Sequence, residues 1–132
     1  MNASFQQPAY AGDGRAGLAY DAPINLCAAL NAKVIRVTLQ HSDGAVLGRS
    51  DSKSSYVPDI DLAEMQAFEY GVSRRHAALV RYQNGLHVLD LGSVNGTFLN
   101  GRRLLQETPY PLNSGDKLIL GELLLTVASA DF

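Results

Sequence analysis

Short runs of alternating apolar residues, separated by turns about every ten residues, constrain most strongly how this chain can fold. The run from Val34 to Leu39 is rich in β-branched residues, and Asn84-Gly85 joins two further runs with the strongest short-range signal of a hairpin. Many short strands with regular turns predict an all-β fold, a sandwich of two mainly antiparallel sheets. Strands are expected over 34–39, 45–47, 76–82, 86–89, 97–99, 117–120 and 123–127.

The first 32 residues lack this pattern and are expected to form a short N-terminal arm, partly ordered or flexible. They are rich in Ala, Gly and Pro and hold only three charged residues. Pro23 stands where a helix can start, so a turn or two of helix is expected over 24–30. A second helical candidate covers 61–68, with Asp61 as its cap. The predicted organisation is an arm over 1–32, a folded domain over 33–128 and a C-terminal tail over 129–132.

Composition excludes several classes of function. A chain of 132 residues is expected to hold one domain and an arm. Eleven Lys and Arg against thirteen Asp and Glu give a net charge of −2, which would repel a nucleic-acid backbone. One cysteine, Cys27, excludes an internal disulfide and a multi-cysteine zinc site. No apolar run approaches the ~20 residues that cross a bilayer, and no signal peptide is recognisable. A cytoplasmic protein that binds neither nucleic acid nor membrane is therefore expected.

Side chains suited to an anion stand at the ends of the predicted strands. They occur in four segments, Gly48-Arg49, Ser73-Arg74-Arg75-His76, 93–97 and Asn100-Gly101. An arginine offers a planar fork of donors to two phosphate oxygens, and a serine hydroxyl adds one hydrogen bond. Taken singly, each segment is more typical of a solvated turn or a structural histidine. Together, converging from separate loops, they would suit a phosphate monoester.

In their order and spacing these segments closely resemble the forkhead-associated (FHA) domain family. The resemblance covers about residues 34–127 and rests on LGRS at 47–50, VSRRHAAL at 72–79, DLGSVNGTFLNG at 90–101 and LNSGDKLILGELLLTV at 112–127. It implies an FHA-type β-sandwich of about eleven strands, whose loops at one end bind phosphothreonine in a partner protein. The implied function is a non-catalytic signalling module without a cofactor, which docks a partner phosphorylated by a Ser/Thr kinase.

The resemblance also implies a role for each residue of the expected site. Arg49 would grip the phosphate, Ser73 would hydrogen-bond a phosphate oxygen, and Arg74 would also reach it. Asn95 would hold the backbone of the bound peptide. Val94 stands where some relatives carry Thr or Ser; it cannot donate a hydrogen bond but could contact the γ-methyl group of phosphothreonine. Structural support of the site is expected from Gly48, His76, Gly96 and Asn100.

The long connection from Ser50 to Val72 bears on ligand choice. Its acidic and aromatic residues could border the site and favour basic residues beside the phosphothreonine. An inert insertion that packs its aromatic residues on the sandwich is at least as well supported. The residues concerned are Asp51, Tyr56, Asp59, Asp61, Glu64, Phe68, Glu69 and Tyr70.

The positions of the threonines indicate that the ligand comes from another chain. Residues 1–32 contain no threonine, so that segment cannot supply a phosphothreonine to its own site. The four threonines of the chain lie within or beside predicted strands: Thr38, Thr97, Thr108 and Thr126. The expected partner is therefore a phosphothreonine-containing protein that binds in trans.

Two other classes of function remain for comparison. A structural or assembly domain could keep the same fold and use contacts that do not depend on phosphate. Val94 mildly favours this alternative, whereas the intact set of Arg49, Ser73 and Asn95 opposes it. An enzyme is not indicated, because Ser73, His76 and Asp90 match the residue types of a hydrolase triad but lack a nucleophile-elbow motif.

Two further motifs do not support a site. The run G-x-G-x-x-G at 12–17 spells the dinucleotide fingerprint, but no convincing strand precedes it, no long helix follows and no βαβ unit exists. The three histidines show no metal-ligand spacing, so no metal site is expected. They are His41, His76 and His87.

Overall fold

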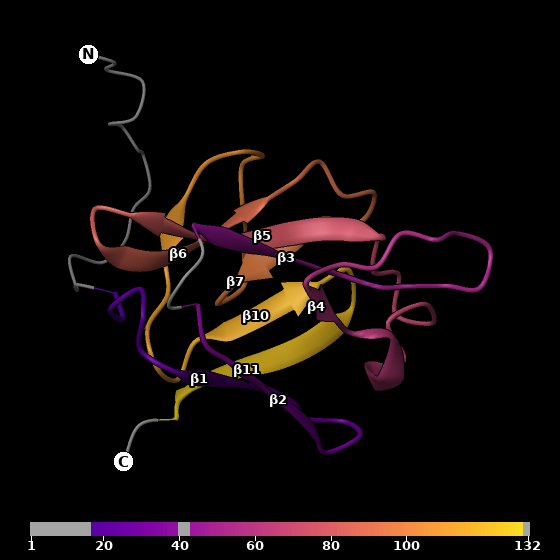
Figure 1. Cartoon of the computed structure of the whole chain (residues 1–132), viewed down its shortest axis with the longest axis horizontal. Coiled ribbons are helices and arrows are strands. Elements are labelled where there is room, and N and C mark those ends of the chain that lie inside the picture. The colour runs from indigo at the N-terminus through magenta and orange to yellow at the C-terminus, as the bar shows by residue number, and fades with distance from the viewer. Residues whose placement is uncertain (1–16, 40–42, 131–132) are drawn as a thin grey trace.

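A computed structural model describes residues 17–39 and 43–130 of the chain. Over these residues eleven strands form two stacked sheets (Figure 1). The six-stranded sheet has the order β2-β1-β11-β10-β7-β8, and the five-stranded sheet has the order β4-β3-β5-β6-β9. The named strands pair antiparallel, except that β3 and β4 are parallel. The predicted all-β sandwich is confirmed. Its strands are β1 Ile24–Ala28, β2 Lys33–Val37, β3 Gly44–Gly48, β4 Ile60–Asp61, β5 Arg75–Tyr82, β6 Gly85–Asp90, β7 Thr97–Leu99, β8 Arg102–Arg103, β9 Tyr110–Pro111, β10 Lys117–Leu120 and β11 Leu123–Ser129.

The core lies between the two sheets and follows from the period-two pattern. Along β11, alternate residues are buried, since successive side chains of a strand point to opposite faces of the sheet. Leucines from both sheets meet in this core, among them Leu26, Leu47, Leu79, Leu118 and Leu125, each fully buried. Burial of this apolar surface is the main stabilising contribution to a sandwich of this size.

Residues Ile24–Ala28 form strand β1, and the helix expected over 24–30 is wrong. β1 pairs on one side with β11 and on the other with β2, and its alternate residues are buried. Two ladders of backbone hydrogen bonds and an inward apolar face outweigh a weak local preference for helix. Tyr20 is also buried in the core. The expected boundary at residue 32 is therefore corrected, because part of the presumed arm completes the six-stranded sheet.

The C-terminal boundary also differs from the expected one. β11 extends to Ser129, which was assigned to the tail. Ala130 is buried, and its backbone N–H donates to the carbonyl of Pro23 at 2.9 Å. This bond joins the residue after β11 to the residue before β1.

The second helical candidate, 61–68, is reduced to a single 3-10 turn, Ala63–Met65. Oδ1 of Asp61 accepts a hydrogen bond from the backbone N–H of Ala63 at 3.0 Å. Gln66 then adopts a left-handed conformation, with φ of 64°, which ends the turn. The apolar side chain of Met65 is buried and anchors this turn on the core.

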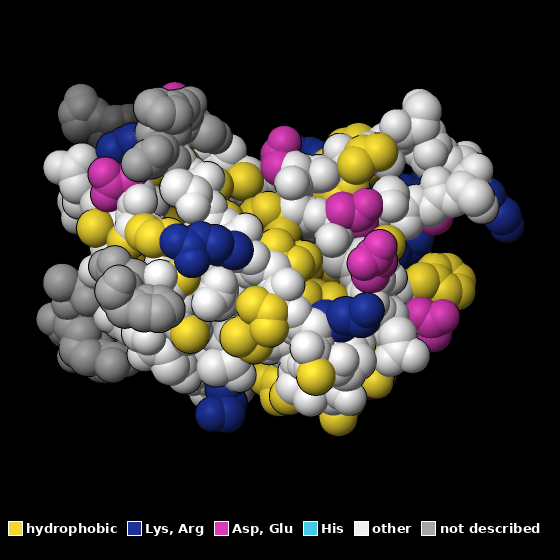
Figure 2. All heavy atoms as spheres, turned by 60° about the horizontal axis from the view of Figure 1, so that its bottom comes forward, with side chains coloured by type: hydrophobic (Ala, Val, Ile, Leu, Met, Phe, Trp, Pro, Cys, Tyr) yellow, Lys and Arg dark blue, Asp and Glu magenta, His cyan; other side chains and the backbone are white. Residues whose placement is uncertain are grey.

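The surface shows no dominant field of one charge on the face turned forward in Figure 2. Lys and Arg side chains lie apart from one another there, with Asp, Glu and hydrophobic side chains between them. Exposed apolar residues of the whole described surface include Leu30, Val34, Phe68 and Val94. In the part of the chain that the structure describes, no helix has the length and apolar character needed to cross a membrane.

Candidate functional site

The residues predicted to form the site meet where three connections come together at one end of the sandwich. Arg49 follows β3, Ser73 and Arg74 precede β5, and Asn95 lies between β6 and β7. The backbone N–H of Arg49 donates to the carbonyl of Arg74 at 3.2 Å. The side chain of Asn95 donates to the carbonyl of Gly71 at 3.0 Å. Hydrogen bonds between the connections therefore hold residues that lie far apart in the sequence.

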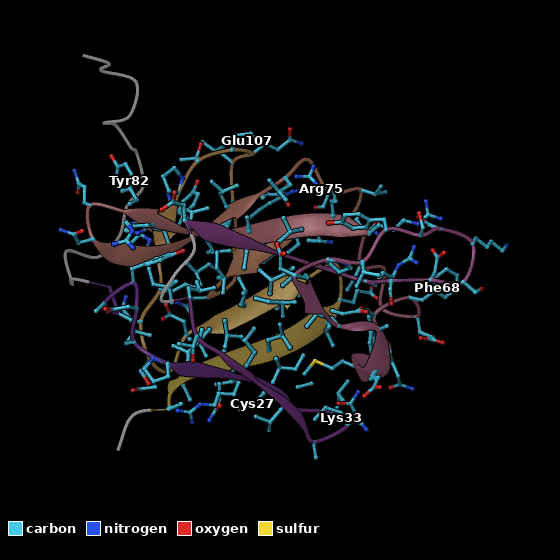
Figure 3. All side chains as sticks on the ribbon, in the orientation of Figure 1. Cys27, Lys33, Phe68, Arg75, Tyr82 and Glu107 are labelled. Carbon is cyan, nitrogen blue, oxygen red and sulfur yellow. The ribbon has the colours of Figure 1, made fainter. Side chains whose placement is uncertain are left out.

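Arg49 is oriented by three contacts, and its side chain is only 15% exposed. Its Nε donates to the carbonyl of Val72 at 2.6 Å, and its Nη1 donates to Oδ2 of Asp51 at 2.9 Å. Its guanidinium also lies 4.9 Å from the ring centroid of Phe68, an exposed aromatic at the end of the molecule (Figure 3). The two hydrogen bonds use two of the five N–H donors of an arginine. The guanidinium is thus held in place with further capacity to donate.

Gly48 allows the first two connections to approach each other. The pairing of β3 with β5 shifts register between Leu47 and Gly48, an irregularity that redirects the chain at the start of the site. A Cβ atom on Gly48 would lie 1.7 Å from the carbonyl oxygen of Arg74. Because no side chain fits there, glycine sets the separation between Arg49 and Arg74.

His76 joins the second and third connections from a fully buried position. Its Nδ1 accepts a hydrogen bond from the backbone N–H of Ser73 at 2.9 Å, so its Nε2 carries the proton and donates to the carbonyl of Gly96 at 2.9 Å. The hydroxyl of Ser73 accepts from the backbone N–H of Val94 at 3.2 Å. Both ring nitrogens of His76 are thus engaged with the backbone, which leaves Ser73 without the imidazole partner that a hydrolase nucleophile needs.

We predict that the protein loses stability as the pH falls below 6.5. Burial lowers the pKa of His76, more than the Gly96 carbonyl and the charge of Asp90 raise it, and burial likewise lowers the pKa of His87. At pH values between the lowered pKa values and the ordinary value of 6.5, the unfolded chain binds more protons than the folded chain. The free energy of unfolding is therefore highest above pH 6.5 and decreases as the pH falls toward the lowered pKa values.

Urea unfolding at pH 7.5, 6.5 and 5.5 measures this loss. The variant His87→Asn should keep the part of the decline that belongs to His76. Equal free energies of unfolding at the three pH values would contradict the prediction.

Asp90, considered in the sequence only as a triad candidate, organises the connection between β6 and β7. Its Oδ1 accepts from the hydroxyls of Ser93 and Thr97, each at 2.6 Å. Its Oδ2 accepts from the backbone N–H groups of Gly92 and Ser93 at 2.9 and 3.1 Å. Burial alone would raise the pKa of Asp90, but these hydrogen bonds outweigh it and hold the pKa below its ordinary value. The buried carboxylate therefore fixes the loop that presents Asn95.

Val94 and Asn95 form the exposed tip of this loop. The side chain of Val94 is 82% exposed, which leaves its methyl groups open to a ligand. Gly71, on which Asn95 is hydrogen-bonded, has φ of 77°, and a Cβ there would lie 2.7 Å from Nδ2 of Asn95. Asn95 also lines a cavity of about 420 Å³ together with Glu69 and Phe98.

Asn100 supports a turn beside the site, and its side chain hydrogen-bonds to Asp116 and Lys117. Its Nδ2 donates to Oδ1 of Asp116 at 3.0 Å, and its Oδ1 accepts from the backbone N–H of Lys117 at 2.9 Å. Its φ of 51° is left-handed, as a tight turn between β7 and β8 requires. Asn100 therefore joins the turn between β7 and β8 to the start of β10.

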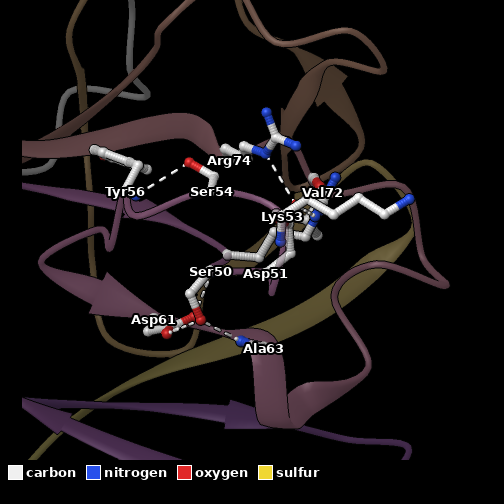
Figure 4. A network of polar contacts seen from close by, with 10 residues as sticks. Ser50, Asp51, Lys53, Ser54, Tyr56, Asp61, Ala63, Val72 and Arg74 are labelled. Carbon is white, nitrogen blue, oxygen red and sulfur yellow. Dashed lines mark hydrogen bonds and ion pairs between the residues drawn. The ribbon is translucent and has the colours of Figure 1, made fainter.

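Asp51 contacts both arginines, which the sequence analysis did not foresee. Its Oδ2 accepts from Nη1 of Arg49 and from Nε of Arg74, both at 2.9 Å. Its Oδ1 accepts from the backbone N–H of Lys53 at 2.8 Å (Figure 4). The hydrogen bond from Arg74, followed by that from Lys53, lowers the pKa of Asp51 to about 2. Two guanidinium groups thus share one anionic oxygen.

The other acidic residues of the 50–72 connection divide into two groups. Asp59 accepts from the backbone N–H of Val46 at 2.8 Å. Asp61 accepts from both the backbone N–H and the hydroxyl of Ser50, at 2.9 and 2.5 Å. Asp59 therefore anchors the connection to β3 and Asp61 joins β4 to Ser50, whereas Glu69 lines the cavity beside Asn95. A preference for basic residues beside the phosphothreonine stays a prediction.

Three further features of the sequence concern metal, thiol and dinucleotide chemistry. Among residues 17–39 and 43–130, no three His, Cys, Asp or Glu side chains are grouped to hold a metal ion. Cys27 is a half-buried free thiol on β1. The G-x-G-x-x-G run at 12–17 lies outside the described residues, except for Gly17.

Comparisons with known proteins agree with this architecture. The model of the family described as FHA domain matches residues 45–121, more than half of the chain. A stretch of 48 residues is 50% identical to a protein phosphatase 1 regulatory inhibitor subunit PPP1R8 homologue from Arabidopsis thaliana, over 36% of this chain and 13% of that protein. The chain spans between 9% and 36% of the length of the curated relatives it matches.

Solved structures share the fold. The FHA domain of the CT664 protein from Chlamydia trachomatis is 27% identical, with a TM-score of 0.59 over 81% of this chain and 95% of that one. Mycobacterium tuberculosis EmbR, in complex with a low-affinity phosphopeptide, is 22% identical, with a TM-score of 0.63 over 84% of this chain and 25% of that one. On the match of the family model and the shared sandwich, this chain belongs to the FHA domain family.

Proposed function

We propose that this domain binds a phosphothreonine peptide of a partner protein that a Ser/Thr kinase has phosphorylated, and that it acts in signalling without catalysing a reaction. The observation that carries the proposal is the meeting of Arg49 and Arg74 at one carboxylate oxygen, next to Ser73 in the chain. A phosphate near pH 7 carries a charge of about −1.5 to −2 and three acceptor oxygens, which match such a set of donors.

Each side chain of the cluster takes one part of the ligand. Arg49 and Arg74 donate to phosphate oxygens, and Ser73 adds the hydrogen of its hydroxyl, whose oxygen already accepts from the Val94 backbone. Asn95 presents its amide to the peptide backbone from the exposed tip of its loop. Val94 contacts the γ-methyl group that distinguishes phosphothreonine from phosphoserine.

Two comparisons support this proposal. The chain belongs to the FHA domain family, and its fold is shared by Mycobacterium tuberculosis EmbR, a protein whose structure contains a phosphopeptide. Two of the four threonines, together with the N-terminal segment, favour a ligand from another protein, whereas Thr38 and Thr108 are not enclosed in the same way. Thr97 is fully buried and donates to Asp90, Thr126 lies within β11, and residues 1–32 contain no threonine.

Calorimetric titration with a library of phosphothreonine peptides tests the proposal. Unphosphorylated peptides of the same sequences and phosphoserine versions serve as the controls. We expect micromolar binding that requires the phosphate, and weaker binding of phosphoserine because the contact with Val94 is lost.

The absence of binding across a diverse library would overturn this function and favour the assembly domain that uses phosphate-independent contacts. Such an assembly would draw on exposed apolar residues, among them Val94 (82%), Leu30 (72%) and Phe68 (71%). Capture of a partner that persists after phosphatase treatment would identify that alternative.

A further inference from the structure

We propose that Asp51 is an intramolecular competitor for the phosphate, which a ligand must displace from the two arginines before it can bind. The inference rests on the proposed function and assigns Asp51 a role in setting its threshold. The carboxylate of Asp51 makes, within the free chain, the contacts that a phosphate would make with Arg49 and Arg74.

The geometry of these contacts is that of a bound anion. A single oxygen, Oδ2, accepts one N–H from each guanidinium at 2.9 Å. Charge-assisted hydrogen bonds of this length are typical of carboxylate and phosphate oxygens alike. The side chains of Asp51 and Arg74 are 23% and 49% exposed, so a ligand in solution can reach the shared oxygen and exchange with it.

The Asp51 carboxylate is already held in place in the free chain, so its contact with the arginines costs little conformational entropy. Oδ1 of Asp51 accepts from the backbone N–H of Lys53 at 2.8 Å, and its carbonyl accepts from the backbone N–H of Ser54 at 3.3 Å. Immediately before it, Ser50 is hydrogen-bonded to Asp61. A turn whose first residues are held by hydrogen bonds therefore keeps the Asp51 carboxylate at a high effective concentration beside the two arginines.

The competitor is present throughout the physiological pH range. The hydrogen bond from Arg74 and that from the Lys53 backbone hold the pKa of Asp51 at about 2, so the side chain is ionised at any pH at which the domain works. The contact therefore does not act as a pH switch. Its effect is a constant cost on every anion that enters.

This constant cost sets a threshold that a phosphate ligand exceeds and a carboxylate ligand does not. An Asp or Glu side chain of a peptide brings one negative charge, the same charge that Asp51 already supplies, and gains nothing by exchange. A phosphothreonine brings a charge of about −1.5 to −2 and three acceptor oxygens, which can also engage Ser73. Asp51 thus keeps the arginines from acidic peptides while a phosphorylated one displaces it.

The test compares the wild type with Asp51→Asn and a matched control, Glu64→Gln. Asparagine keeps the oxygen that accepts from the Lys53 backbone but loses the charge. Glu64→Gln removes the same charge from an exposed position in the same connection. Asp51→Ser, whose hydroxyl can also accept from the Lys53 backbone, repeats the test if the first variant does not fold.

Calorimetric titration with a phosphothreonine peptide that binds the wild type, and with its Asp and Glu versions, gives the outcome. We expect the dissociation constant for the phosphopeptide to fall about three- to tenfold in Asp51→Asn, since two partly exposed ion pairs no longer compete. Glu64→Gln should stay within about twofold of the wild type, because its charge is screened. The affinity for acidic peptides should rise in Asp51→Asn by a similar factor.

The outcomes separate the two proposals. Equal or weaker phosphopeptide binding by Asp51→Asn would overturn the competitor role and make Asp51 a support of the arginines, with the proposed function intact. Binding of the phosphopeptide by the wild type, and tighter binding by Asp51→Asn, would support both proposals. Failure of all the proteins to bind any phosphopeptide would overturn the proposed function, and the competitor role with it.

Discussion

Replacing Arg49 with alanine is expected to weaken phosphothreonine binding by about a hundredfold or more. The guanidinium is 15% exposed and held by the Val72 carbonyl and by Asp51, so it meets the phosphate already oriented and partly desolvated. Loss of one partner of a charge pair in such a setting costs about 2–5 kcal/mol. Calorimetric titration of the variant with a phosphopeptide that binds the wild type measures the change.

Arg75→Ala is the matched control for Arg49→Ala. It removes the same charge from an exposed residue at the start of β5. Its affinity should stay within about twofold of the wild type, because a solvated charge acts only through screened electrostatics. Equal losses in the two variants would show that overall positive charge, rather than the position of Arg49, governs binding.

Arg49→Lys should bind more weakly than the wild type and better than Arg49→Ala. A lysine restores the charge but lacks the planar fork that bonds the Val72 carbonyl and a ligand at once.

Gly48→Ala is expected to destabilise the fold by about 3 kcal/mol or more and to abolish the site. The added Cβ would lie 1.7 Å from the carbonyl oxygen of Arg74 and 2.6 Å from its carbon, so backbone must move against backbone. Such overpacking costs about 1–3 kcal/mol where side chains can shift, and backbone atoms yield less easily. It would also break the hydrogen bond from the Arg49 backbone to the Arg74 carbonyl. Chemical denaturation measures the loss of stability.

Gly101→Ala is the matched glycine control. Gly101 has φ of 87°, yet a Cβ there would meet nothing within 4 Å. The cost should be the strain of a left-handed residue, about 1–2 kcal/mol, and phosphopeptide binding should persist. If Gly48→Ala were no more destabilising than Gly101→Ala, close contact at Gly48 would not be what limits the site.

Local pattern was enough to predict most strands but not the first. The alternation along 76–82 and the turn near Asn84 predicted the β5–β6 hairpin, although the left-handed turn residues are Gln83 and Asn84. Segment 24–30 has little signal of its own, and its strand exists because β2 and β11 supply ladder partners on both sides. β2 follows β1 directly in the sequence, whereas β11 is about a hundred residues away, beyond the reach of any local pattern.

Some residues of the candidate site could likewise be predicted from the sequence, and others could not. Motifs in the sequence singled out Arg49, Ser73, Arg74 and Asn95, and the structure brings their connections together. The sequence marked Asp90 only as one residue type of a hydrolase triad. Its hydrogen bonds to buried hydroxyls and N–H groups exist only in the folded loop. The one weak signal for that role was its position just before the glycine turn.

The sequence by itself determined that the chain forms a sandwich, where most strands begin and which residue types stand at their ends, because alternation and turn chemistry are local properties. Only the tertiary structure decided which of three similar aspartates meets the arginines. Asp59 and Asp61 bond to β3 and Ser50, whereas Asp51 reaches Arg49 and Arg74. Arg74 lies 23 residues further along the chain, and that contact exists only once β3 and β5 have paired.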